Sequence, residues 1–217
     1  MPAQLGYWAI RGLVQPIRLL LNYVGEDFED VLYNLGKGPE FSREEWLSVK
    51  FTLGLDFPNL PYYIDDDVKL TQSNAILRYL ARKHNLYGET EKEQAHIDLL
   101  LDEITDLRQG FSRLCYGADF DDKKIENYVE ETKPKLAQLE KYLADKQYFI
   151  GDKVTVCDFN IYDILDAFKV LEPKLLADSP KLEEYHERFE ELPAIKAYIN
   201  SEKFISRPIN NTCAKWF

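Results

Sequence analysis

The sequence predicts a mixed α/β domain over residues 1–84, followed by an all-α helical bundle over residues 91–217. Up to residue 84, short β-type runs alternate with amphipathic stretches in the order β-α-β-α-β-β-α, which is typical of a small sheet covered by helices. Turn-forming residues around Gly88 then indicate a linker at 85–90. After the linker, apolar residues recur only at helical spacing.

The first half of the α/β domain is read from turn residues and periodicity. Residues 4–10 form a first predicted strand. A helix is expected to open at Gln15-Pro16, because proline is favoured in the first turn, and to stop at Gly25. Residues 28–35 predict a second strand, and residues 42–49 predict a short helical patch.

The second half predicts a hairpin followed by a helix. Two short β-type runs, 62–64 and 68–71, flank an Asp-Asp-Asp turn. Ser73 precedes apolar residues at helical spacing and is therefore a candidate N-cap. Because a helix start presents unpaired N–H groups and a positive dipole, Gln72 and Ser73 are candidates to hold a carboxylate.

A proline before the hairpin suggests a second binding element. A cis Leu60-Pro61 bond would turn the backbone N–H and C=O of Leu60 toward an extended peptide bound alongside. Together with Gln72 and Ser73, this arrangement predicts a cradle for a small anionic peptide.

The C-terminal half predicts several amphipathic helices. A long apolar stripe between Ile97 and Leu114 is interrupted only by Gly110. In the next run, up to Leu143, Pro134 either kinks one helix or opens a new one. Thr155-Val156-Cys157-Asp158 is a variant capping box with a structural role. Two more helices are expected near 180–191 and 193–201, before an extended tail.

Composition narrows the classes of partner and the compartment. A net charge of −11 disfavours binding to nucleic acid or to an anionic membrane. No apolar run reaches the roughly 18–20 residues of a membrane span, and no signal peptide is recognised. The three cysteines are widely spaced and form no CxxC motif. We therefore expect reduced thiols and a cytoplasmic location. The histidines share no ligand spacing, so no metal site is expected. The cysteines are Cys115, Cys157 and Cys213, and the histidines are His84, His96 and His186.

Several motifs stand in a characteristic order along the chain. They are Gly6-Tyr7-Trp8, the loop at 34–42, Arg43-x-x-Trp46-x-x-x-Lys50, residues 54–61, Gln72-Ser73-Asn74-Ala75-Ile76 and the capping box at Thr155. In this order and spacing they resemble a cytosolic glutathione S-transferase of the mu class, over essentially the whole chain. The resemblance implies a thioredoxin-like N-terminal domain, a helical C-terminal domain and a homodimer. It also implies conjugation of the glutathione thiolate to hydrophobic electrophiles, a detoxification reaction with glutathione as co-substrate and no other cofactor.

The resemblance assigns Tyr7 to activate the glutathione thiol. A thiol with a pKa near 8.5 is only about 3% ionised at pH 7, and the thiolate is the nucleophile. A tyrosine hydroxyl is still protonated at neutral pH, and its hydrogen bond to an anion contributes about 1.5–3 kcal/mol. The other implied contacts are Trp8, Arg43, Trp46 and Lys50 at the glycine carboxylate, Asn59, Leu60 and Pro61 at the cysteinyl portion, Gln72 and Ser73 at the γ-glutamyl carboxylate, and Asp106 of the partner subunit at the ammonium group.

The resemblance also implies an electrophile pocket and a dimer interface. Tyr116 would donate a proton or a hydrogen bond to the electrophile. Gln109, Gly110 and Ser112 make this wall smaller and more polar than a bulky aliphatic one, so the electrophile preference stays open. The implied pocket residues are Leu13, Gln109, Ser112, Tyr116 and Ile209, and the implied interface residues are Phe57 as an aromatic key and Arg78 with Asp98 as an ion pair.

Two alternatives share the predicted fold and stay open. One is a non-catalytic ligand-binding or structural protein, and the other is a glutathione-dependent isomerase that differs only in the second pocket. A thiol–disulfide oxidoreductase is disfavoured, because no cysteine lies near Tyr7 in the sequence.

Overall fold

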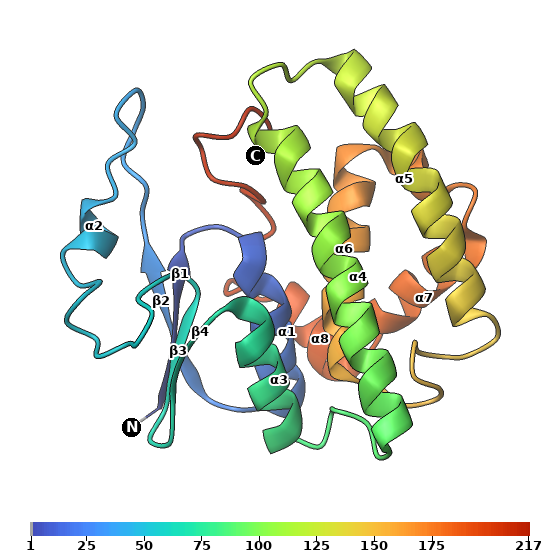
Figure 1. Cartoon of the computed structure of the whole chain (residues 1–217), viewed down its shortest axis with the longest axis horizontal. Coiled ribbons are helices and arrows are strands. Elements are labelled where there is room, and N and C mark those ends of the chain that lie inside the picture. The colour runs from blue at the N-terminus through green and yellow to red at the C-terminus, as the bar shows by residue number, and fades with distance from the viewer. Residues whose placement is uncertain (1) are drawn as a thin grey trace.

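The structure is a computed structural model that describes residues 2–217, and its N-terminal part contains a four-stranded sheet (Figure 1). The strands are β1 (Ala3–Trp8), β2 (Phe28–Tyr33), β3 (Tyr62–Ile64) and β4 (Lys69–Thr71). Their order is β2-β1-β3-β4, with β1 parallel to β2 and antiparallel to β3. β3 and β4 form the predicted antiparallel hairpin. The predicted mixed sheet is confirmed.

The first two strands end two residues earlier than predicted. The Ile10 N–H donates to the Trp8 C=O at 2.7 Å, which is a local turn and not a bond between strands. Trp8 pairs with Tyr33 at the end of the parallel register, so β2 stops there as well.

Three helices lie against the sheet. They are α1 (Gln15–Val24), α2 (Glu44–Leu47) and α3 (Ser73–Lys83), and a short 3-10 turn, η1 (Gly12–Val14), precedes α1. α1 begins at the predicted Gln15-Pro16 and ends at Gly25, which adopts a left-handed conformation with φ of 69°. α1 and α3 lie on one side of the sheet and α2 on the other (Figure 1).

The start of α3 differs from the prediction by one residue. Gln72, not Ser73, is the N-cap, because the Gln72 C=O accepts the N–H of Ile76 at 3.0 Å. Ser73 is the first helical residue, and no side chain caps this helix. Gln72 has a φ of 71°, a conformation that non-glycine residues rarely adopt. The Leu60-Pro61 bond is cis, as hypothesised.

The C-terminal part is helical, as predicted. Its elements are α4 (Glu91–Tyr116), α5 (Asp122–Leu143), α6 (Val156–Leu171), η2 (Pro173–Leu176), α7 (Pro180–Glu190) and α8 (Pro193–Ile199). Pro134 lies inside α5, so this run is one helix and not two. The predicted capping box of Thr155 with Asp158 opens α6, and a second one, of Thr90 with Glu93, opens α4.

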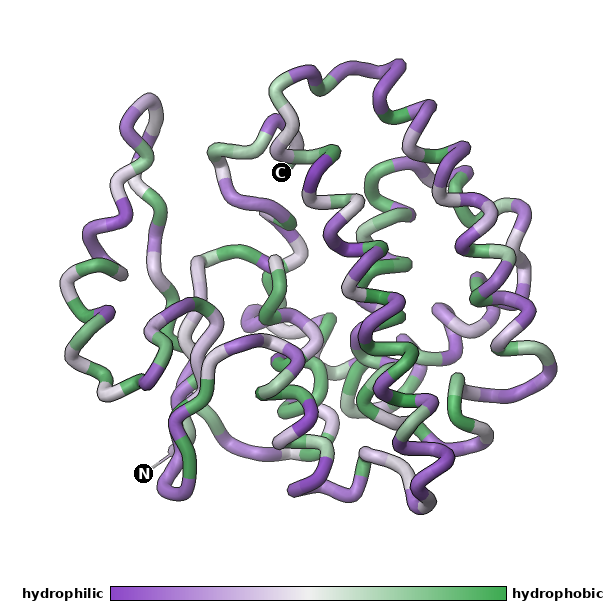
Figure 2. The backbone as a smooth tube through the Cα atoms, in the orientation of Figure 1, coloured by the Kyte–Doolittle hydropathy of each residue, from purple (hydrophilic) through white to green (hydrophobic). Residues whose placement is uncertain are grey.

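One large core joins the sheet side to the helical part. It contains Leu5 and Ile17 next to the sheet, and Ile97 and Phe168 from the later helices, in a single buried cluster. α6 is buried along nearly its whole length, whereas hydrophobic and hydrophilic residues alternate along α4 and α5 (Figure 2). Within residues 2–217, none of the helices combines the length and apolar character needed to cross a bilayer.

A buried ionic network connects the end of β1 to α4 and α6. The Arg11 guanidinium, almost fully buried, contacts Asp163 Oδ1 at 2.7 Å and Asp166 Oδ2 at 2.5 Å. Arg108 of α4 contacts the other oxygen of Asp163 at 2.7 Å. Burial alone would lower the pKa of Arg11, but the charges of Asp163 and Asp166 outweigh it and raise that pKa. Asp163 therefore ties three separate segments together.

Removing this carboxylate should destabilise the fold strongly. We expect Asp163→Ala to lower the free energy of unfolding by about 3–5 kcal/mol, because Arg11 and Arg108 would lose a partner that both contact away from solvent. Urea denaturation measures this change. Lys196→Ala is the control, since it removes an ion pair with Glu191 whose side chains are about half exposed or more, and it should cost less than about 1 kcal/mol. Equal losses in the two variants would contradict the role of Asp163.

Candidate functional site

A cleft of about 350 Å³ lies between the start of α3 and the middle of α4. It brings together two groups of residues that were predicted separately, the carboxylate-binding pair at the start of α3 and part of the electrophile pocket. Its lining residues are Gln72, Ser73 and Asn74 from the start of α3, Thr105, Arg108, Gln109 and Ser112 from α4, and Leu13 and Asn160.

Tyr7 lies beside this cleft, near the end of β1. The Leu13 N–H donates to the Tyr7 hydroxyl oxygen at 3.3 Å, so the hydroxyl hydrogen remains available to a ligand. Gly12 allows this approach, because a Cβ built there would lie 2.6 Å from the Tyr7 ring. Burial raises the pKa of Tyr7, and the Leu13 hydrogen bond and the charges of Arg108 and Arg18 offset this only in part. Tyr7 is therefore a protonated donor at neutral pH.

The C-terminal tail packs against the loop that follows β1. The N–H groups of Arg11 and Gly12 donate to the carbonyls of Pro208 and Ile209, each at 2.9 Å. Ile209 is buried and does not itself line the cleft, so its place in the electrophile pocket stays a prediction. The loop after β1 is therefore attached to the tail as well as to the ionic network.

Tyr116 stands at the end of α4 and contacts the same tail. The Asn211 N–H donates to the Tyr116 hydroxyl at 2.8 Å, which leaves the hydroxyl hydrogen free to donate. Burial raises the pKa of Tyr116 to about 12, so this phenol is also protonated at neutral pH. Tyr7 is close enough to contribute to this shift.

The residues expected at the glycine carboxylate gather around α2. Trp46 is buried and packs against Tyr33 with ring centroids 5.4 Å apart, and Trp8 packs against the same cluster. Arg43 is exposed, and Lys50 lies 5.3 Å from the ring of Phe51. Among residues 2–217, neither Arg43 nor Lys50 has a carboxylate partner within ion-pair distance. Two cations thus remain free in an acidic protein.

The segment before β3 lies next to the α2 cluster. Pro61 is buried, Asn59 is exposed, and the Leu60 side chain packs against the α2 cluster. The backbone N–H and C=O of Leu60 make no hydrogen bond with any other residue in 2–217. This edge can therefore pair with an extended ligand.

The residues expected at a dimer interface differ in exposure and in their contacts within the chain. Phe57 is 78% exposed, and Asp106 is exposed on α4 without lining the cleft of its own chain. Arg78 contacts Asp98 at 2.7 Å, but both belong to one chain, because α3 and α4 place them side by side. The ion pair forms inside one chain, and the location of both residues at a dimer interface stays a prediction.

Four lining residues were not predicted from the sequence. Asn74 donates to the Thr105 hydroxyl at 2.8 Å, and Asn160 donates to the Asn74 side-chain oxygen at 3.4 Å. Arg108 brings a guanidinium, paired with Asp163, to the cleft wall. Its helical spacing from Ser112, four residues on, was the available signal.

One cluster outside the cleft has the composition of a metal site. Ligand atoms of Asp166, His186 and Glu190 lie within 4.8 Å of one another. Arg11 and His186 already contact Asp166, and the Tyr162 hydroxyl donates to Glu190 at 2.8 Å. Burial would raise the pKa of Asp166, but the His186 hydrogen bond and the Arg11 charge lower it. The cluster is satisfied by the protein's own donors and extends the ionic network.

Comparisons with known proteins agree with this geometry. Residues 3–82 match the model of the glutathione S-transferase N-terminal domain, and residues 105–202 match that of the C-terminal domain. Glutathione S-transferase Mu 2 of Mus musculus is 49% identical, and glutathione S-transferase Mu 1 of Bos taurus is 47% identical. Each alignment spans 216 residues, 100% of this chain and 99% of the relative.

Two solved structures resemble the fold closely. The pi-class glutathione S-transferase of Onchocerca volvulus matches with a TM-score of 0.86 at 32% identity, covering 99% of this chain and 100% of that one. The glutathione S-transferase Blo t 8 matches with a TM-score of 0.86 at 35% identity, covering 98% of each chain. With its thioredoxin-like sheet and helical second part, this chain belongs to the glutathione S-transferase family, among the mu-class enzymes.

Proposed function

We propose that this transferase binds glutathione along the cleft and the α2 cluster, ionises its thiol with the Tyr7 hydroxyl, and conjugates the thiolate to hydrophobic electrophiles. The observation that carries the proposal is the buried, protonated Tyr7 hydroxyl, whose hydrogen no other residue in 2–217 accepts. Its hydrogen bond is worth about 1.5–3 kcal/mol, or one to two pKa units. That shift raises the thiolate fraction at pH 7 from about 3% to between a quarter and three quarters.

The two ends of glutathione are held by different groups. We assign the γ-glutamyl carboxylate to Gln72 and Ser73, where the α3 start presents unpaired N–H groups. Arg43 and Lys50, which lack carboxylate partners in residues 2–217, are suited to the glycine carboxylate. Leu60 is suited to hydrogen-bond the cysteinyl backbone. Trp8, Trp46, Asn59 and Pro61 complete this side, and Asp106 of the partner subunit faces the ammonium group.

The electrophile, which is the second substrate, binds against the wall formed by α4 and the C-terminal tail. Arg108, Gln109 and Ser112 give this wall polar character next to Leu13. Tyr116, with its hydroxyl hydrogen free, is the donor to the electrophile. Electrophiles that carry an oxygen acceptor suit this wall, since its guanidinium, amide and hydroxyl groups are all donors.

A homodimer completes each site. A small groove of about 140 Å³ between α4 and α5 is lined largely by leucines, including Leu99 and Leu139. We assign it to Phe57 of the partner subunit, because Phe57 projects from its own chain with 78% of its surface exposed. Such an arrangement brings the partner's α4, and with it Asp106 of the partner subunit, toward the glutathione cradle.

The cellular location, the biological role and the domain division are also part of the proposal. All the cysteines are free, which supports a reducing, cytoplasmic location. The detoxification role is supported by membership of the glutathione S-transferase family. The division into domains at 85–90 stays a proposal, supported by the gap between α3 and α4. The comparisons lend no support to a non-catalytic role.

Tyr7→Phe tests the activity directly. Wild type should conjugate glutathione to a chlorodinitrobenzene-type electrophile. At saturating glutathione, Tyr7→Phe should shift the rising limb of the pH profile of kcat/KM for the electrophile upward by about one to two pH units. The loss is therefore largest at low pH and shrinks above the free-thiol pKa. Tyr128→Phe, a partly buried tyrosine outside the cleft, is the control. Wild-type activity in Tyr7→Phe at pH 6.5, or no conjugation by wild type, would refute the proposal.

Gln72→Gly separates strain from binding. Glycine tolerates the φ of 71° at this position, so the variant should gain about 1 kcal/mol of stability, the relieved strain less glycine's own entropy cost. Glutathione should bind more than about tenfold more weakly, because a hydrogen bond to its carboxylate is lost. Thermal unfolding and calorimetric titration measure the two effects. Ala144→Gly, at another positive φ of 51°, should gain stability with unchanged affinity. Unchanged affinity in Gln72→Gly would remove its binding role.

Phe57→Ala tests the dimer. Removing a buried aromatic anchor should weaken association by about 2–4 kcal/mol, so sedimentation velocity at sub-micromolar concentration should show monomer. Phe217→Ala, which removes another exposed aromatic side chain, should leave the dimer intact. A Phe57→Ala protein that sediments as the wild-type dimer would show that Phe57 is not the anchor.

A further inference from the structure

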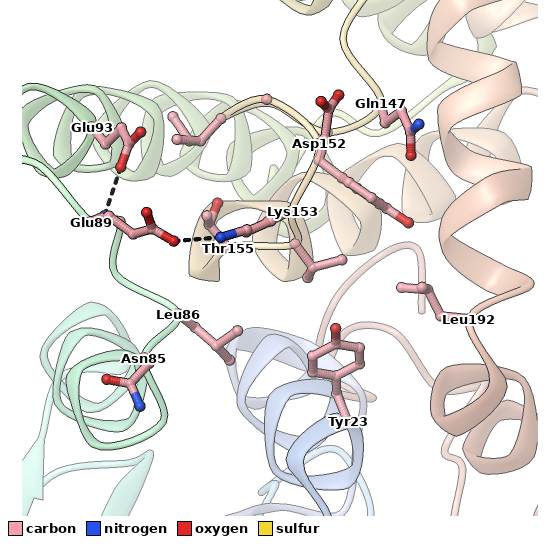
Figure 3. A pocket seen from close by; sticks show the side chains of 15 residues that line it. Tyr23, Asn85, Leu86, Glu89, Glu93, Gln147, Asp152, Lys153, Thr155 and Leu192 are labelled. Carbon is pink, nitrogen blue, oxygen red and sulfur yellow. Dashed lines mark hydrogen bonds and ion pairs between the residues drawn. The ribbon is translucent and has the colours of Figure 1, made fainter.

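A second, larger cavity lies away from the cleft, on the segment that joins the two parts of the fold. Its volume is about 770 Å³. Tyr23 of α1 lies on one side, Leu86 and Glu89 of the connecting segment on another, and Lys153 and Leu192 complete it (Figure 3). It shares no lining residue with the cleft that holds Gln72 and Arg108, so the proposed reaction does not account for it.

Two tyrosine hydroxyls at this cavity have no hydrogen-bond partner among residues 2–217. Neither Tyr23 nor Tyr148 makes a side-chain hydrogen bond within residues 2–217, although Tyr148 is only 7% exposed. Tyr23 packs edge-on against Phe159 at 5.4 Å, and Tyr148 against Tyr185 at 6.5 Å, which fixes both rings. The Tyr23 hydroxyl points into the space between the surrounding side chains (Figure 3). Both rings are fixed, and both hydroxyls are accessible from the cavity, so each can hydrogen-bond a ligand that enters it.

The charges around the cavity select the sign of that ligand. Glu89 pairs with Lys153 at 2.5 Å, and both side chains are about three quarters exposed. The Glu93 carboxylate accepts the N–H groups of Glu89 and Thr90. Asp152 has no hydrogen bond or ion pair within the described residues. The lining carries three carboxylates and one ammonium group, and the Arg188 guanidinium, which donates to the carbonyl of the lining residue Gln147, adds a second cation beside it. The surroundings are therefore net negative by one charge, which favours cations over anions.

The remaining walls are apolar. Leu86, Ile150, Val154 and Leu192 line the cavity, and Leu86 and Val154 are buried. The volume is in the range of small-molecule sites. Burial raises the pKa of both Tyr23 and Tyr148, so the phenols stay neutral and their oxygens can accept a hydrogen bond from an ammonium group. The rings also offer faces on which a cation is stabilised.

We propose that this cavity binds small amphiphilic amines, with the ammonium group near the hydroxyls of Tyr23 and Tyr148 and the carboxylate of Asp152. The apolar body of the ligand packs against Leu86, Ile150 and Leu192. Glutathione and its conjugates are anionic, so this site excludes them, and the amine is bound at the same time as the substrates.

Calorimetric titration with tryptamine and with indole-3-propionic acid tests this site. The two probes share an indole ring and differ in the sign of their charge. Tryptamine should bind with about millimolar affinity or better, and about tenfold more tightly than the acid. Saturating glutathione should leave tryptamine binding unchanged. Displacement by glutathione, equal affinity for the two probes, or no tryptamine binding at all would each overturn the proposal, the last showing a cavity that holds water only.

Two variants locate the bound amine. Tyr148→Phe should weaken tryptamine binding about three- to tenfold, the range for a lost hydrogen bond. Asp152→Asn should reduce the preference for tryptamine over the acid. Tyr128→Phe, outside the cavity, should bind tryptamine like wild type. Conjugation activity should be unchanged in these three variants. Wild-type tryptamine affinity in both Tyr148→Phe and Asp152→Asn would overturn the assignment to this cavity.

Discussion

The contact of Asp163 with two arginines is the interaction on which the site depends. This carboxylate, almost fully buried on α6, holds Arg11 from the loop after β1 and Arg108 from α4. Because a buried charge is stable only when it is paired, neither arginine can move away without a large cost. The loop that carries Gly12 and Leu13 is thereby fixed, and Leu13 in turn contacts the Tyr7 hydroxyl. The surroundings of the Tyr7 hydroxyl, the candidate catalytic group, thus depend on an ionic contact between the loop after β1 and the helical part.

The candidate site, which is the cleft together with the neighbouring α2 cluster, combines two kinds of electrostatic feature that would let an acidic chain bind an anionic peptide. At one end, Gln72 holds the start of α3 in a conformation that leaves backbone donors open, at the expense of local strain. At the other end, Arg43 and Lys50 lack carboxylate partners among residues 2–217. Tyr7, a neutral donor, contacts Leu13 in the wall of the cleft. The net charge of −11 therefore does not govern the site, because local donors do.

Periodicity and turn chemistry predicted most of the fold, and local motifs predicted part of the site. Gln15-Pro16 and the Thr155 capping box marked helix starts correctly, because such signals act within one turn. The start of α3 was misplaced by one residue, since serine is the commoner N-cap and the strained Gln72 is not visible in a pattern. Arg108 was missed because its role depends on Asp163, a residue on another helix. Contacts distant in sequence leave no local signal.

The most direct test of this account is the ionisation of glutathione bound to the enzyme. Ultraviolet absorbance of the thiolate, followed against pH in the binary complex, gives the pKa of the bound thiol without any electrophile. The account predicts about 6.5–7.5 in wild type and a value near the free-thiol 8.5 in Tyr7→Phe. A bound thiol that titrates near 8.5 in both proteins would contradict the claim that the Tyr7 hydroxyl activates glutathione.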